Sequence, residues 1–78
     1  MKLRTIQQLT ALKAVYNLSK GNIAIPVSLI TICNELKSSD KVVVSGDLRY
    51  LEDNGYLNHT GFIYHLTSSG LRYIADLP

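Results

Sequence analysis

The sequence predicts a small α+β domain that is mainly α-helical: three core helices, a β-hairpin and a short last helix. Three observations indicate this class. Apolar residues recur at helical spacing in separate stretches, a well-capped helix ends at Gly55, and two short β-prone runs follow it around Thr60-Gly61. With 78 residues, the chain is expected to form a single domain over positions 1–78.

The first expected helix covers residues 3–19, which contain neither Gly nor Pro. Its polar sector is narrow and most of the remaining circumference is apolar. Such a helix is either central in its own domain or buried against a second chain, and the sequence leaves both alternatives open. Gly21-Asn22 is expected to end the helix.

Residues 23–27 alternate in the manner of a short strand, and Pro26 restricts it to a sheet edge with two or three pairings. Ser28 is expected to cap the next helix, whose apolar stripe is Leu29, Ile32, Cys33 and Leu36. Because Cys33 lies in this stripe, it is interpreted as a small buried hydrophobe rather than a catalytic thiol. Residues 37–39 form a polar turn.

The next expected helix spans residues 40–54. Asp40 is its N-cap, Gly55 is its left-handed stop, and its buried side chains are Val44, Leu48 and Leu51. The hairpin follows over residues 56–66, with strands 56–59 and 62–66 joined by Thr60-Gly61. Thr67 or Ser68 then caps a last helix over residues 71–77.

Composition limits the classes of function. The net charge of +2 permits contact with nucleic acid without requiring it. Cys33 is the one cysteine, which excludes an intramolecular disulfide and favours a reducing, cytoplasmic location. No apolar run approaches the roughly 20 residues that span a bilayer. His59 and His65 lack a third metal ligand and no glycine-rich phosphate loop occurs, so we expect no enzyme activity, metal or cofactor.

Two strings resemble winged helix-turn-helix proteins of bacterial, archaeal and phage regulators. SLITICNELKSSDKVVVSGDLRYLEDNGYL is similar to their helix-turn-helix with its "LE..G.L" ending, and IYHLTSSGLRYI is similar to a second wing strand followed by an "LT..G..Y" last helix. Small MarR-like, PadR-like and phage-encoded proteins are the nearest in these features. The resemblance implies that helix 40–54 enters the major groove of double-stranded DNA and that hairpin 56–66 is the wing.

On this basis the outward face of helix 40–54 is the candidate DNA-binding surface. Arg49 is expected to form a bidentate pair with a guanine or a phosphate, and Ser45 to donate a hydrogen bond to either. Val42 is expected to contact a thymine methyl group. Gly46 permits either close approach of DNA or tight packing against another helix. The full set of candidates is Ser28, Lys37, Ser39, Lys41, Val42, Ser45, Arg49, His59 and Thr60, the last two at the expected wing tip.

Three features favour an alternative, a winged-helix module that binds protein. Residues 40–54 contain two basic against four acidic side chains, and the run Val42–Val44 leaves apolar surface exposed. The expected wing tip also carries His59 and Thr60 in place of Lys or Arg. Regulators of this type commonly dimerise to match two half-sites. In either case we expect a homodimer through the first and last helices.

Overall fold

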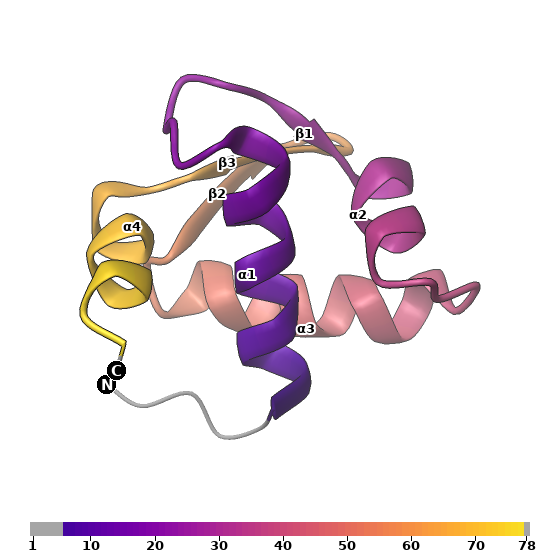
Figure 1. Ribbon diagram of the computed structural model, residues 1–78. Coiled ribbons are helices and arrows are strands. Elements are labelled where there is room, and N and C mark those ends of the chain that lie inside the picture. The colour runs from indigo at the N-terminus through magenta and orange to yellow at the C-terminus, as the bar shows by residue number, and fades with distance from the viewer. Residues whose placement is uncertain (1–5, 78) are drawn as a thin grey trace.

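The computed structural model describes residues 6–77 and forms a small α+β fold, as predicted. It consists of four helices and a three-stranded antiparallel sheet (Figure 1). In chain order the elements are α1 (Ile6–Ser19), β1 (Val27–Ser28), α2 (Leu29–Glu35), α3 (Lys41–Asp53), β2 (Leu57–Thr60), β3 (Ile63–Leu66) and α4 (Ser68–Ala75). The expected start of the first helix, at residues 3–5, lies outside the described residues.

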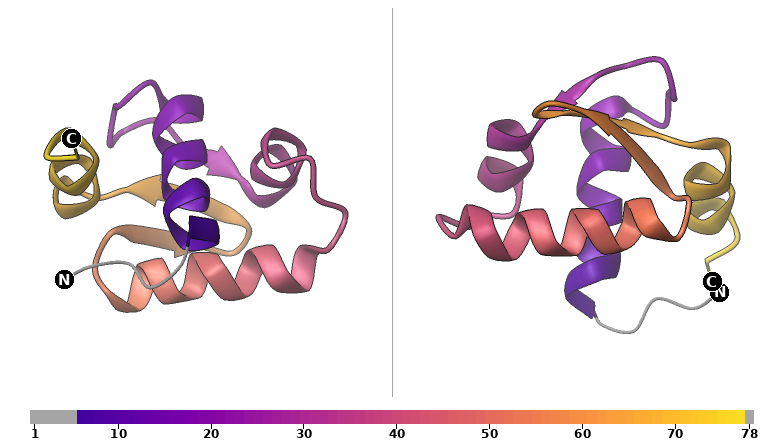
Figure 2. Two further views of the ribbon diagram at one scale, coloured as in Figure 1. Left: turned by 60° about the horizontal axis from the view of Figure 1, so that its bottom comes forward. Right: turned by 180° about the vertical axis from the view of Figure 1, so that it is seen from behind.

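Helix α1 is central in its own domain, which was one of the two alternatives that its apolar circumference left open. It contacts the three other helices as well as β1 and β3, and it runs across the front of the sheet and of α3 (Figures 1 and 2). Ala11, Leu12, Ala14 and Val15 are buried by these contacts. Little of the apolar surface of α1 therefore remains for a second chain, apart from Ile6, which is 83% exposed.

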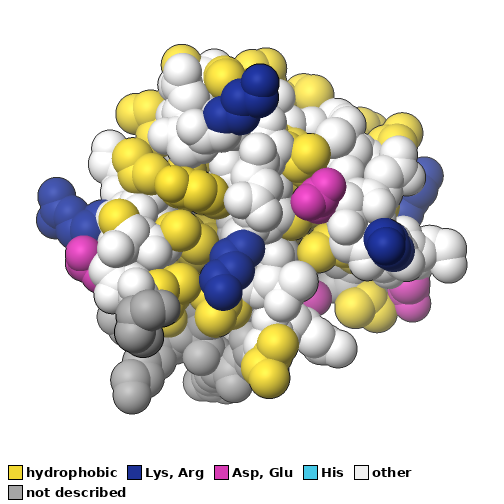
Figure 3. Space-filling model, viewed as in Figure 1, with side chains coloured by type: hydrophobic (Ala, Val, Ile, Leu, Met, Phe, Trp, Pro, Cys, Tyr) yellow, Lys and Arg dark blue, Asp and Glu magenta, His cyan; other side chains and the backbone are white. Residues whose placement is uncertain are grey.

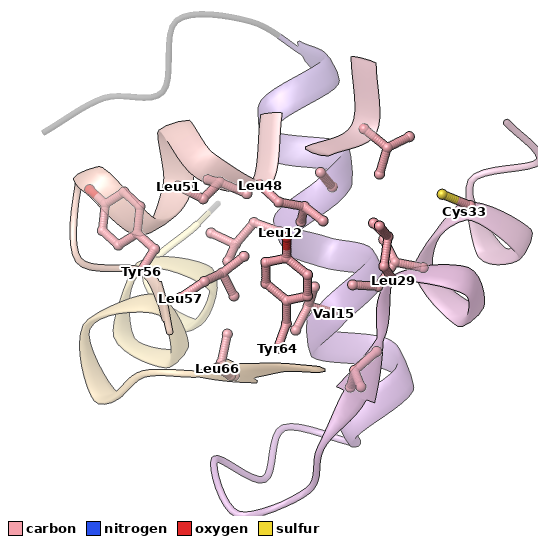
Figure 4. Close-up of a cluster of buried hydrophobic side chains, with 14 residues drawn as sticks. Leu12, Val15, Leu29, Cys33, Leu48, Leu51, Tyr56, Leu57, Tyr64 and Leu66 are labelled. Atoms are coloured by element: carbon pink, nitrogen blue, oxygen red, sulfur yellow. The ribbon is translucent and has the colours of Figure 1, made fainter. Parts of the chain in front are cut away.

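The core lies between α1, α2, α3 and the inner face of the sheet (Figure 4). Leu12, Ile32, Leu48, Leu51, Leu57 and Leu66 are its largest fully buried aliphatic side chains. Val44, Leu48 and Leu51 are the buried residues of α3, and Cys33 is buried in α2, as the periodicity predicts. Because these side chains face inward, the orientation of α3 about its axis is fixed.

The predicted N-caps of α2, α3 and α4 are confirmed. The Ser28 side chain accepts a hydrogen bond from the backbone N–H of Thr31, and Asp40 accepts from Val42 and Val43. Of the two candidates for the last cap, Thr67 accepts from Gly70 at 3.0 Å. Helix α4 consequently begins at Ser68, earlier than expected, and it ends at Ala75.

The first three helices end in one way, with a residue in the left-handed conformation followed by a hydrogen bond to the carbonyl five positions back, at 2.9–3.0 Å. The left-handed residues are Lys20, Lys37 and Gly55, with φ of 55°, 55° and 81°. Gly55 was predicted for this role. In α1 the stop is Lys20, one position before the expected Gly21.

The sheet order is β1-β3-β2. Strand β1 is an edge strand with two pairings, as predicted, but it covers only Val27–Ser28. The expected strand over residues 23–25 was wrong, because Asn22 folds this segment into a turn: its side chain accepts from the N–H of Ala24 at 2.9 Å and its carbonyl from Ile25 at 3.2 Å.

The hairpin turn is Gly61-Phe62, one residue later than predicted, and Thr60 belongs to β2, paired with Ile63. Gly61 has φ of 60°, so the Gly-first pattern of a type II′ turn decides the register.

No helix within residues 6–77 is long and apolar enough to cross a membrane.

Candidate functional site

The outward face of α3 carries a stripe of three polar side chains. Lys41, Ser45 and Arg49 follow one another at four-residue spacing and therefore lie above one another along the helix. Lys41 and Arg49 are exposed, whereas Ser45 is half-buried. Val42 lies beside the stripe and is 82% exposed. The stripe thus lies beside the buried side chains of α3, about a quarter turn around the helix from them.

The stripe runs through two surface hollows on the side of α3 that faces the hairpin. Seen from behind, α3 lies in front and the hairpin crosses above it, with its turn toward α2 and its base toward the end of α3 (Figure 2, right). The first of the two hollows, which we name the tip hollow, measures about 210 Å³. It is lined by Ser28, Leu29, Ile30, Lys41 and Phe62. The second, the α3–hairpin hollow, measures about 420 Å³ and is lined by Ser45, Arg49, Glu52, Asp53, His59 and Tyr64.

The tip hollow joins the start of α2, the start of α3 and the hairpin turn. The backbone N–H of Leu29 donates to the carbonyl of Phe62 at 2.8 Å, which holds the turn against α2. Ile30 is 60% exposed and Phe62 is 75% exposed, so the hollow is apolar apart from Ser28 and the ammonium group of Lys41.

The α3–hairpin hollow contains an interaction that the sequence analysis missed. Glu52 Oε2 accepts from the backbone N–H of His59 at 3.1 Å and lies 2.5 Å from His59 Nδ1. The imidazole also stacks on Tyr64, with ring centroids 5.3 Å apart. Burial raises the pKa of Tyr64, and the nearby charge of Glu52 raises it further. The expected position of His59 at the hairpin tip was therefore wrong, because its side chain turns toward α3.

Of the four carboxylates in residues 40–54, Asp40 and Asp47 lie away from the α3–hairpin hollow, whereas Glu52 and Asp53 line it together with Arg49. Asp40 caps the helix, and Glu52 is bonded to His59. Asp47 lies in a third hollow, formed by α1, α3 and the turn between α2 and α3, where burial raises the pKa of its carboxyl group. Only Asp53 among these four carboxylates lines the α3–hairpin hollow without a hydrogen bond to a described residue.

Gly46 lies in open space on the exposed side of α3. A Cβ atom built on it would meet no heavy atom within 4 Å. The alternative in which Gly46 allows tight packing against another helix of the chain was therefore wrong.

The remaining candidates are spread around the two hollows. Ser28 lines the tip hollow while it caps α2. Lys37 and Ser39 are exposed in the turn before α3, and Thr60 is exposed at the end of β2; none of these three lines either hollow. Ile30 and Phe62 were missed, although a residue directly after the glycine of a Gly-X turn is expected to be exposed at the tip.

The two histidines lie on opposite faces of the hairpin. His59 pairs with Tyr64 and His65 pairs with Asn58, and neighbouring residues of a strand alternate between faces. Within residues 6–77 no three side chains of His, Cys, Asp or Glu are arranged to hold a metal ion.

Comparison with known proteins yields no match for this chain among family models, curated proteins or solved structures.

Proposed function

We propose that this chain is a winged helix-turn-helix domain that binds double-stranded DNA as a transcriptional regulator, with α3 in the major groove and the β2–β3 hairpin as the wing. The order of the elements and the sheet order β1-β3-β2 support this proposal, as does the resemblance of the two strings quoted above. We expect the protein to act in the cytoplasm, where the free thiol of Cys33 stays reduced.

The observation that carries the proposal is that the two cations of α3 have no partner among the described residues. The side chains of Lys41 and Arg49 make no hydrogen bond or ion pair with any described residue, so both cations are available to a ligand. Asp40 and Glu52 are bonded to other groups, and Asp47 lies in a separate hollow. Glu52 and Asp53 share the hollow with Arg49, but Glu52 is engaged by His59. The free guanidinium group of Arg49 suits bidentate contact with guanine or phosphate.

The test is fluorescence anisotropy with a mixed-sequence duplex at low and near-physiological salt, followed by selection of a preferred site. Binding should weaken steeply as salt rises, because neutralised phosphates release counterions. On the selected site, Arg49→Ala should cost roughly 1–3 kcal/mol if Arg49 contacts a base. Arg72→Ala is the matched control, because Arg72 is exposed on α4 and its removal changes the net charge equally. Equal effects of the two variants would refute the role of Arg49.

Exposed apolar side chains favour a second candidate function, binding of a protein partner. Ile30, Val42 and Phe62 are more than half exposed, and Ile30 and Phe62 share the tip hollow. An absence of DNA binding even at low salt would favour this candidate. A protein captured stoichiometrically should then be lost by Val42→Asp and retained by Arg72→Ala; retention by both would exclude this surface.

We also propose that the protein forms a homodimer through α1 and α4. Apolar side chains gather along the junction of these helices (Figure 3). They include exposed Ile6 and half-buried Leu9, Leu71 and Ile74. Because most of the apolar surface of α1 is buried in its own core, this face is smaller than the sequence suggested. Light scattering should give a dimer mass at tens of micromolar protein, and a monomer mass would contradict the proposal.

A further inference from the structure

We infer that Glu52 is a positioning residue, which holds the hairpin at the orientation to α3 that DNA binding requires. This inference rests on the proposed function and adds a role for a carboxylate whose charge alone would oppose binding.

The geometry of Glu52 suits such a role. One carboxylate oxygen, Oε2, receives both the backbone N–H of His59 and its ring Nδ1, at 3.1 and 2.5 Å. Strand β2 is an edge of the sheet, so the N–H groups that point away from β3 lack a partner strand. Glu52 satisfies one of these groups and ties the middle of β2 to the last turns of α3.

The imidazole contact holds in either charge state of His59. A neutral ring with its proton on Nδ1 donates to the carboxylate, and so does an imidazolium. The His59 ring is also held in place by Tyr64, because it stacks on this residue, which is only 7% exposed. Arg49 and Asp53 are the other charged side chains that line this hollow.

The hairpin is also anchored at both ends. At its base, Thr67 Oγ1 donates to the carbonyl of Gly55 at 2.6 Å, and at its turn Leu29 donates to Phe62. The Glu52 anchor joins β2 to α3 directly, one turn after Arg49. Since contacts to the DNA backbone fix the register of a protein on the duplex, a change in the angle between hairpin and α3 would misplace Arg49 or the wing.

The sign of a mutational effect distinguishes positioning from simple repulsion. Glu52→Ala, Glu52→Gln and Asp53→Ala each remove one negative charge beside the proposed DNA surface. If charge alone matters, all three bind DNA more tightly than the unchanged protein. Only Glu52→Ala removes the hydrogen-bond acceptor, because the Gln amide oxygen still accepts from the N–H groups of His59. Asp53 is the matched control, because it is the adjacent carboxylate without such a contact.

The experiment measures anisotropy of the full chain with the selected duplex, well below the melting temperature of each variant. We expect Glu52→Ala to weaken binding by roughly 5- to 150-fold, the range of a lost base contact, while Glu52→Gln and Asp53→Ala bind at least as tightly as the unchanged protein. Tighter binding by Glu52→Ala, or an equal loss in the Ala and Gln variants, would overturn the inference and leave the proposed function intact.

Two further outcomes are decisive. If Glu52→Ala does not fold, His59→Ala replaces it, because that variant removes the ring contact and keeps the charge of Glu52; unchanged binding would overturn the inference. If the unchanged protein binds no duplex at low salt, the proposed function itself fails and the inference fails with it.

Discussion

Replacing Gly46 with Ala is expected to stabilise the fold and to weaken DNA binding. Gly46 lies in the interior of α3, where glycine costs about 1 kcal/mol relative to alanine. Packing does not require glycine here, because a Cβ atom at this position meets nothing within 4 Å. Close approach of DNA to the backbone of α3 would require it.

The two effects can be estimated separately. Recovery of about 1 kcal/mol of helix propensity should raise the melting temperature by about 4–8 °C in a domain of this size. A methyl group between α3 and the duplex acts as overpacking does in a tightly packed site, where it costs about 1–3 kcal/mol. This loss of binding free energy corresponds to a Kd weakened by roughly 5- to 150-fold.

Thermal unfolding by circular dichroism and anisotropy with the selected duplex measure the two effects. Gly70→Ala is the control, because Gly70 is also helical but enclosed: its Cβ would collide with the carbonyl oxygen of Tyr56 and lie 3.0 Å from Leu66 Cδ1. Gly70→Ala should therefore lower the melting temperature. A higher melting temperature of Gly46→Ala with unchanged affinity would refute close approach of DNA at Gly46, and a lower melting temperature would refute the argument from open space.

Two further predictions concern stability. Lys20→Gly should raise the free energy of unfolding by up to about 1 kcal/mol in urea titration, because Lys20 is left-handed with φ of 55°; a loss of stability would contradict this explanation of the α1 terminus. Asp47→Asn should stabilise the protein at pH 7 but not at pH 3. Burial raises the pKa of Asp47 above its ordinary 3.8, so the unchanged protein loses stability as the pH rises from about 3.8 through the folded pKa. An equal increase in the free energy of unfolding of Asp47→Asn at pH 3 and pH 7 would contradict this explanation.

The parts of the fold that local pattern determines were predicted correctly. The i, i+4, i+7 spacing of Val44, Leu48 and Leu51 identified the buried face of α3, since a helix places such residues on one side whatever surrounds it. Asp40 and Gly55 identified its ends, because both act through bonds within a few residues.

The errors concern features that distant residues or competing turns decide. Alternation over residues 23–27 indicated a longer strand, yet only Val27 and Ser28 find partners on β3, and Asn22 folds the residues before them into a turn. The hairpin turn was placed at Thr60-Gly61, whereas the chain turns at Gly61-Phe62, so the predicted strand pairing was off by one position.

The candidate site was predicted in part. The stripe of Lys41, Ser45 and Arg49 follows from helical periodicity alone. By contrast, the contact between Glu52 and His59 depends on where the hairpin folds over α3, which no pattern within either segment specifies. For the same reason, a count of charges along residues 40–54 did not reveal which face each carboxylate occupies.

The burial of Cys33 gives the protein an internal reporter of its own opening. It is the chain's one thiol and is 4% exposed within α2, so an alkylating reagent reaches it only when α2 separates from the core. When reclosing is fast compared with alkylation, the labelling rate measures the equilibrium population of that open state. Mass spectrometry after timed labelling would thus follow how a bound duplex restrains the helix-turn-helix half of the domain, without any introduced probe.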